Sequence, residues 1–145
     1  MTIMRKIYVC MMFLFLGLCM NAQTKNDSYK FKEHQVDNFI NEVYGDQAQK
    51  LVFSNQKRYQ TLRKLIVERM QIVRQSEIRG KKYPKITDEG MLNMYNKNLK
   101  HDGFSKTTFN PLKYNLQFFD IAARAYRIDN TEYLLIIQPQ PKLQN

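Results

Sequence analysis

"YRIDNTEYLLIIQP", residues 126–139, is the strongest indication of the fold. An Asp129-Asn130 pair separates two runs rich in tyrosine and branched aliphatic residues. Asp and Asn both tolerate the left-handed conformations that tight turns require. The pattern therefore predicts a C-terminal antiparallel β-hairpin with strands at about 124–128 and 132–138.

The register of this hairpin depends on the length of its turn. A two-residue turn places Arg127 opposite Glu132, whereas a four-residue turn places Arg127 opposite Leu134. Because a cross-strand pair of opposite charges is stabilising, we predict the two-residue turn.

The second strand of the hairpin has apolar side chains on both faces, since side chains alternate along a strand. One face carries Tyr133, Leu135 and Ile137, and the other carries Leu134 and Ile136. A lone hairpin is marginally stable in water, so a third strand and a helical layer are needed to cover it. Residues 70–75 could continue a preceding helix, but the β-branched Ile72 and Val73 favour a strand.

Helical periodicity in the first half of the chain predicts the covering layer. Residues 36–44 have apolar side chains at i, i+3, i+4, i+7 and i+8, and Gly45 supplies a stop. A second helix is predicted from a cap at Ser54 or Asn55 to about residue 70.

Two further helices are predicted in the second half. Thr87 can cap a helix that runs to Leu99, and Asn110-Pro111 is typical of a helix start. Beyond Pro111, Tyr114, Leu116 and Phe118 alternate, which leaves a strand open there. The sequence thus predicts an α+β fold with three to four helices packed on a small antiparallel sheet that contains the hairpin.

The N-terminal segment has the pattern of a secretory signal peptide. Two basic residues precede a 14-residue apolar run at 7–20, shorter than the roughly 20 residues that a membrane span needs. We expect cleavage after Ala22. Lipid anchoring at Cys19 is disfavoured, because Leu18 stands where a lipoprotein signal needs a small residue.

Cleavage would leave a single small domain over residues 23–145. Both cysteines, Cys10 and Cys19, belong to the signal peptide, so the mature chain has no thiol for a disulfide, a nucleophile or a metal site. The mature chain is expected to be exported, either periplasmic or secreted, with no transmembrane segment.

Few residues suggest catalysis or metal binding. His34 and Asp37 have a helical i, i+3 spacing, but two ligands do not make a metal site, so we expect none. The sequence indicates no cofactor. The alternative to a non-catalytic role is a small enzyme whose site is assembled around His101, with Asp102 and Tyr114.

Positive charge is concentrated in the middle of the chain. The formal net charge of the whole chain is +10, and residues 74–85 hold five bases against one acid. This loop predicts an anion-binding site, whose candidate residues are Arg79, Lys81, Lys82, Tyr83 and Lys85. The preceding helix would extend the positive field through Arg63, Lys64 and Arg69.

Two interpretations without a ligand stay open for this charge. The loop can be a solvated connection, and part of the charge can neutralise an acidic first helix that carries Glu33, Asp37 and Glu42.

The segments "FNPLKYN" (109–115) and "YRIDNTEYLLII" (126–137), behind a signal that ends in "NAQ", resemble uncharacterised small exported proteins of Gram-negative bacteria. The resemblance implies export and one small domain, and it assigns no activity or site residue. We therefore expect a non-catalytic domain with a binding or structural role in the cell envelope or outside the cell. Its expected partners are an anionic polymer or an envelope protein.

Overall fold

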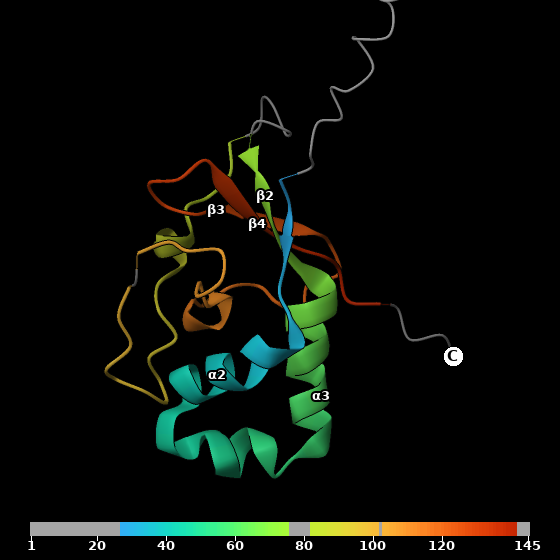
Figure 1. The fold of residues 1–145 in the computed structure, drawn as a ribbon, viewed down its shortest axis with the longest axis vertical. Coiled ribbons are helices and arrows are strands. Elements are labelled where there is room, and N and C mark those ends of the chain that lie inside the picture. Colours follow the sequence, from blue (N-terminus) through green and yellow to red (C-terminus); the bar gives the residue numbers. More distant parts are fainter. Residues whose placement is uncertain (1–26, 76–81, 102, 142–145) are drawn as a thin grey trace, which may run out of the picture.

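The fold is an α+β arrangement built on a four-stranded antiparallel sheet in the order β1-β2-β4-β3. This computed structural model describes residues 27–75, 82–101 and 103–141. The strands are β1 (Tyr29–Lys30), β2 (Met70–Arg74), β3 (Arg124–Arg127) and β4 (Tyr133–Ile137). The helices gather at one end of the molecule and the sheet lies at the other (Figure 1). The predicted fold class, including the C-terminal hairpin, is confirmed.

The first helix, α2 (Glu33–Tyr44), buries the side that its periodicity predicts. Its buried apolar residues are Val36, Phe39, Ile40, Val43 and Tyr44. Gly45 ends the helix with φ of 52°, a left-handed value that glycine adopts without strain. A short irregular helical segment follows over Gly45–Gln47 and Gln49–Phe53 and leads into the next helix.

The second long helix, α3 (Gln56–Lys64), continues as a π-helical turn over Leu65–Arg69 and then directly as β2. Asn55 caps α3, since its side chain accepts a hydrogen bond from the Arg58 N–H at 3.0 Å. The predicted strand at residues 70–75 is confirmed, because β2 pairs with both β1 and β4.

The hydrophobic core lies between the helices and one face of the sheet. Leu135 and Ile137 of β4, Ile72 of β2 and Tyr126 of β3 belong to this core cluster. On the opposite face Leu134 is also fully buried, and Ile136 is half-buried. The helices therefore cover the face of β4 that carries Leu135 and Ile137.

The predicted helix from Thr87 to Leu99 is wrong. The chain forms a short 3₁₀ turn at Ile86–Glu89, and Gly90 then adopts φ of 73° and ψ of 173°. Beyond it, Met91 bridges Tyr114 in antiparallel fashion, and the Leu92 N–H donates to the Lys113 carbonyl at 2.6 Å. Backbone pairing with a distant segment outweighs a helical pattern that contains a glycine.

The predicted helix start at Asn110 is confirmed, but the helix is much shorter than expected. The Asn110 side chain accepts a hydrogen bond from the Leu112 N–H at 3.1 Å, and the resulting 3₁₀ helix covers only Pro111–Lys113. Tyr114 then forms the bridge to Met91, so the chain leaves the helix for an extended course.

The predicted register of the hairpin is also wrong. Arg127 pairs with Leu134, and the Ile128 N–H donates to the Tyr133 carbonyl at 2.9 Å, so the turn has four residues. Glu132 pairs with Arg74 of β2 at 2.7 Å. Because β4 is a central strand, Glu132 has a basic neighbour on its other side, which the hairpin sequence alone does not reveal.

Candidate functional site

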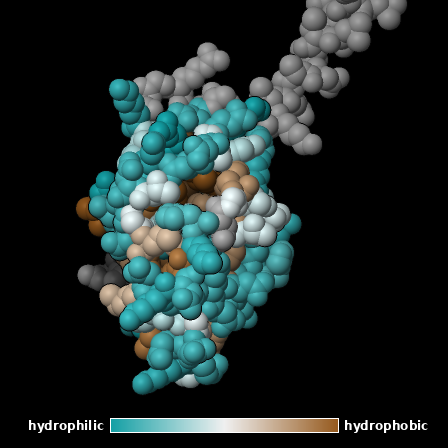
Figure 2. Space-filling view, turned by 90° about the vertical axis from the view of Figure 1, so that its left-hand side faces the viewer, coloured by the Kyte–Doolittle hydropathy of each residue, from teal (hydrophilic) through white to brown (hydrophobic). Residues whose placement is uncertain are grey.

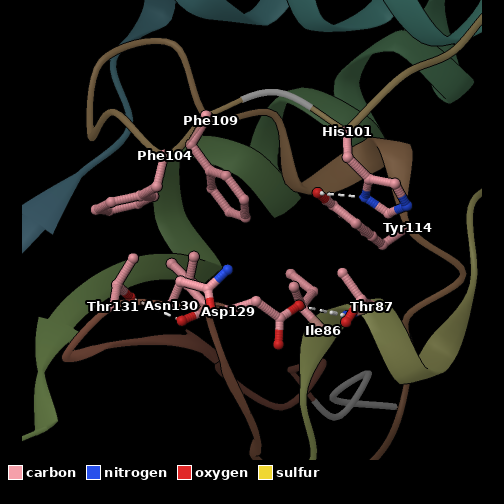
Figure 3. Close-up of a pocket in the computed structure, with 11 residues that line it drawn as sticks. Ile86, Thr87, His101, Phe104, Phe109, Tyr114, Asp129, Asn130 and Thr131 are labelled. Carbon is pink, nitrogen blue, oxygen red and sulfur yellow. Dashed lines mark hydrogen bonds between the residues drawn. The ribbon is translucent and has the colours of Figure 1, made fainter.

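A cavity of about 420 Å³ opens between the β3–β4 turn and the loop that precedes Asn110. Its described lining residues come from three segments of the chain: Ile86 and Thr87, then His101, Gly103, Phe104, Phe109 and Tyr114, and finally Ile128, Asp129, Asn130 and Thr131. Figure 3 shows two walls, with aromatic rings on one side and the residues of the turn on the other. Apolar side chains are visible in a hollow that hydrophilic residues surround in Figure 2.

The polar wall is the four-residue turn of the hairpin. Asn130 has φ of 56°, and the Thr131 hydroxyl donates to the Ile128 carbonyl at 2.7 Å. The same hydroxyl accepts a hydrogen bond from the Tyr133 N–H at 3.1 Å, which fixes the turn. The Asn130 side-chain amide points towards the aromatic wall (Figure 3) and makes no hydrogen bond with a described residue.

Asp129 joins the polar wall to the 3₁₀ turn at Ile86–Glu89. Its Oδ2 accepts a hydrogen bond from the Thr87 N–H at 3.3 Å. Its Oδ1 is buried and has no hydrogen-bond partner among the described residues. The backbone supports the same junction, since the Arg127 N–H donates to the Pro84 carbonyl at 2.8 Å.

The aromatic wall is a row of four rings. The ring centroids of Phe104 and Phe109 are 5.6 Å apart, those of Phe109 and Tyr114 are 6.0 Å apart, and those of Tyr114 and His101 are 5.6 Å apart. The His101 Nδ1 lies 3.4 Å from the Tyr114 hydroxyl. Phe109 and Tyr114 are buried, whereas His101 is exposed at the mouth.

The loop that precedes Asn110, here called the aromatic loop, carries Phe104 and Phe109. Contacts among Asp27, Lys106 and Tyr133, here called the clamp, hold this loop on the sheet. Asp27 pairs with Lys106 and accepts a hydrogen bond from the Tyr133 hydroxyl at 3.1 Å. Lys106 lies over the Tyr133 ring at 4.4 Å, and the Phe104 and Tyr133 ring centroids are 5.3 Å apart. The hydrogen bond from Lys106, followed by that from Tyr133, lowers the pKa of Asp27 below its usual 3.8.

A buried polar cluster supports the wall from the side of α2. Lys113, whose side chain is 4% exposed, pairs with Glu42 and donates to the Lys100 carbonyl at 3.2 Å. The Asn110 amide donates to Glu42 Oε2 at 2.8 Å and to the Phe39 carbonyl at 3.0 Å. These bonds fix the segment that carries Phe109 and Tyr114.

The predicted anion-binding residues are only partly within the described chain. Arg79 and Lys81 lie outside it, as does Asp102. Lys82 and Lys85 are exposed and Tyr83 is half-buried, immediately before the Ile86–Glu89 turn. Lys85 bridges Arg127 through its backbone, but Lys82, Tyr83 and Lys85 are not among the residues that line the cavity.

Several basic residues of the predicted positive field have partners within the fold. Arg63 pairs with Glu33 and Glu68, so the acidic first helix neutralises part of the charge of α3. Arg69 donates to the carbonyls of Phe118 and Gln138 at 2.7 and 2.9 Å. Lys64 stays exposed.

Sequence reasoning found part of the cavity. His101 and Tyr114, named for a scattered site, do meet at its wall. The sequence assigned Asn130 only to the predicted turn, and it gave Thr131 and Phe104 no role in a site. The available signal was the Asp-Asn turn itself, because it places side chains in a fixed direction at the end of a hairpin.

The described residues contain no group of three or more His, Cys, Asp or Glu that could hold a metal ion. Within the same residues, no helix has the length and apolar character to cross a membrane. No protein-family model, curated protein or solved structure matches this chain.

Proposed function

We propose that this chain is an exported, non-catalytic binding domain whose ligand site is the cavity between the aromatic loop and the β3–β4 turn. The signal-like N-terminal sequence supports export. The observation that carries the binding role is the cavity with its aromatic and polar walls.

The dimensions and composition of the cavity support a small ligand. Its volume of about 420 Å³ falls within the roughly 300–1,000 Å³ of small-molecule sites, which combine apolar walls with a few placed polar groups. Contacts within the fold support both walls, since internal hydrogen bonds hold the turn and the Asp27–Lys106–Tyr133 clamp holds the loop. A preformed site loses little conformational entropy on binding.

A screen by ligand-detected NMR tests this proposal on the mature chain, residues 23–145. The panel contains neutral pyranosides, alkyl amines and aromatic carboxylates. We expect saturation transfer to at least one class, and we expect both Asn130→Gly and Phe104→Leu to weaken it. Glycine keeps the left-handed backbone of residue 130 while removing the amide, and leucine keeps apolar volume while removing the ring.

Ile121→Ser is the matched control, because Ile121 is 90% exposed and does not line the cavity. Transfer that is the same in the two cavity variants and in wild type would place the ligand elsewhere and refute the proposal.

A second candidate function is catalysis at the same cavity, and one observation favours it. His101, Tyr114 and Asp129 line one cavity, and an imidazole beside a hydroxyl is a possible acid–base pair. Incubation of the bound probe with the protein, followed by mass spectrometry, separates the two functions. A product that forms with wild type and not with His101→Gln would establish an enzyme, whereas unchanged probe supports the binding domain.

A further inference from the structure

We propose that the ligand of this cavity is a neutral polyhydroxylated ring, that is, one sugar unit held between the aromatic wall and the Asn130 amide. This inference rests on the proposed function and adds the chemical class of the ligand. Three features support this class: the charge of the lining, the shape of the two walls and the Asn130 amide, which makes no hydrogen bond with a described residue.

The charge of the lining disfavours an anionic ligand. The described lining residues include one carboxylate, that of Asp129, and neither lysine nor arginine. A phosphate or carboxylate group would lose its hydration shell on entering the cavity and would find no lysine or arginine among the described lining residues. The cavity therefore recognises a different chemistry from the exposed Lys82 and Lys85.

A cationic ligand is also disfavoured, because the Asp129 carboxylate already has a structural role. Its Oδ2 accepts the Thr87 N–H, and its Oδ1 is buried beyond the reach of solvent. An ammonium group gains most from a carboxylate that it can contact directly. Apart from Asp129, the polar side chains of the described lining are the Asn130 amide, the His101 imidazole and the hydroxyls of Thr87, Tyr114 and Thr131.

The aromatic wall fits one face of a sugar ring. The C–H groups on one side of a pyranose form an apolar face that can lie against aromatic rings. Phe104 is the half-buried ring of the row and Phe109 is 7% exposed, so Phe104 offers the larger free surface. Phe104 is also the ring that the clamp holds in place through Tyr133.

The opposite wall fits the hydroxyl groups. An amide both donates and accepts, as two neighbouring ring hydroxyls require, and the Asn130 amide makes no bond with a described residue. The Thr131 hydroxyl already donates to one partner and accepts from another, so it contributes little. Asn130 is thus the main polar contact, and exposed His101 can add a second one at the mouth.

Titration calorimetry with neutral methyl pyranosides (glucoside, galactoside, mannoside and N-acetylglucosaminide) tests the inference on residues 23–145. We expect at least one to bind, with Asn130→Gly and Phe104→Leu each weakening it by about tenfold. Ile121→Ser should bind like wild type. A sulfated pyranoside and tetramethylammonium should bind at least about tenfold more weakly than the neutral ligand.

The outcomes separate the two proposals. If the neutral sugars fail to bind but an amine or a carboxylate binds and is weakened by Asn130→Gly, the sugar inference is overturned and the binding site stands. If no probe of any class depends on Asn130 or Phe104, both proposals fail together. Equal affinity for the neutral and sulfated pyranosides would also contradict the inference.

Discussion

At the scale of single residues, Asp27 connects the start of the described chain to the aromatic loop. Its carboxylate is bonded to Lys106 and Tyr133, and these bonds lower its pKa below 3.8. A lowered pKa means that the folded state favours the ionised form, so the contribution to stability is present above pH 3.8 and is lost as the pH falls through the folded-state pKa.

Asp27→Asn should therefore lower the denaturation midpoint at neutral pH and have no effect at a pH below the folded-state pKa. Urea titrations of wild type and Asp27→Asn from neutral to acidic pH measure this. Asp46→Asn, at an exposed carboxylate, is the control for charge alone. If the denaturation midpoints of wild type and Asp27→Asn differ by the same amount in acid as at neutral pH, the ionised Asp27 carboxylate is not what stabilises the clamp.

Glu42 and Lys113 give a second prediction at this scale. Truncating the partner of a buried charge typically costs about 3–5 kcal/mol, and we expect about 2–3 kcal/mol for Glu42→Ala because Glu42 is partly exposed. Lys113→Met should destabilise less, since it removes the buried charge itself and keeps the length of the side chain. Chemical denaturation of both variants gives the comparison, and a larger loss for Lys113→Met would contradict this account.

At the scale of elements, the segment around Gly90 distinguishes the observed chain path from the helix that the sequence predicts. Gly90 has φ of 73° and ψ of 173°, a conformation that is essentially reserved for glycine, and no atom lies within 4 Å of an added Cβ. Gly90→Ala should therefore destabilise the fold by about 1–3 kcal/mol through backbone strain alone. In a helix the same substitution would stabilise the protein by about 1 kcal/mol. A lower melting temperature for Gly90→Ala therefore supports the observed turn, and a higher one would contradict it.

The two faces of β4 give another prediction for this element. Leu135 is fully buried in the core, so an aspartate there costs several kcal/mol, which is comparable to the stability of a small domain. Leu135→Asp should be unfolded by circular dichroism, whereas Ile136→Asp should keep a cooperative transition, because the Ile136 side chain is only half-buried. Unfolding of both variants would mean that the second face is as tightly covered as the first.

Local patterns were sufficient where local interactions decide the structure. The apolar side of α2, the Asn55 cap and the strand at residues 70–74 follow from periodicity, capping and β-branching. The register of the hairpin and the path of residues 87–99 depend on partners far away in the sequence: Arg74 for Glu132, and Tyr114 for Met91. The cavity was hidden for the same reason, because its walls come from three separate segments.

At the scale of the whole molecule, the proposed role requires export. In a Gram-negative host, the chain should be cleaved after Ala22, so that the mature protein begins at Gln23 and appears in the periplasm or the medium. Intact-mass spectrometry of the purified protein measures this. A mass that includes the first 22 residues, or a diacylglycerol on Cys19, would contradict it.

The cavity and the basic middle of the chain are two candidate binding surfaces, and they differ in charge. The described lining of the cavity has one carboxylate and no lysine or arginine, while several basic residues of the middle of the chain are engaged in ion pairs and carbonyl contacts. Binding of an anionic polymer through Lys82, Lys85 and their neighbours stays a prediction, and it would be recognised by a steep loss of affinity with salt.

A two-dimensional amide NMR titration of residues 23–145 with the pooled neutral methyl pyranosides tests directly whether the cavity binds a sugar. We predict that the shifted amides cluster at residues 86–87, 103–104 and 129–131, which line the cavity, and that Asn130→Gly needs about tenfold more sugar to reach the same shifts. Shifts confined to the basic residues at 57–64 and 82–85, or no shifts at saturating sugar, would contradict it.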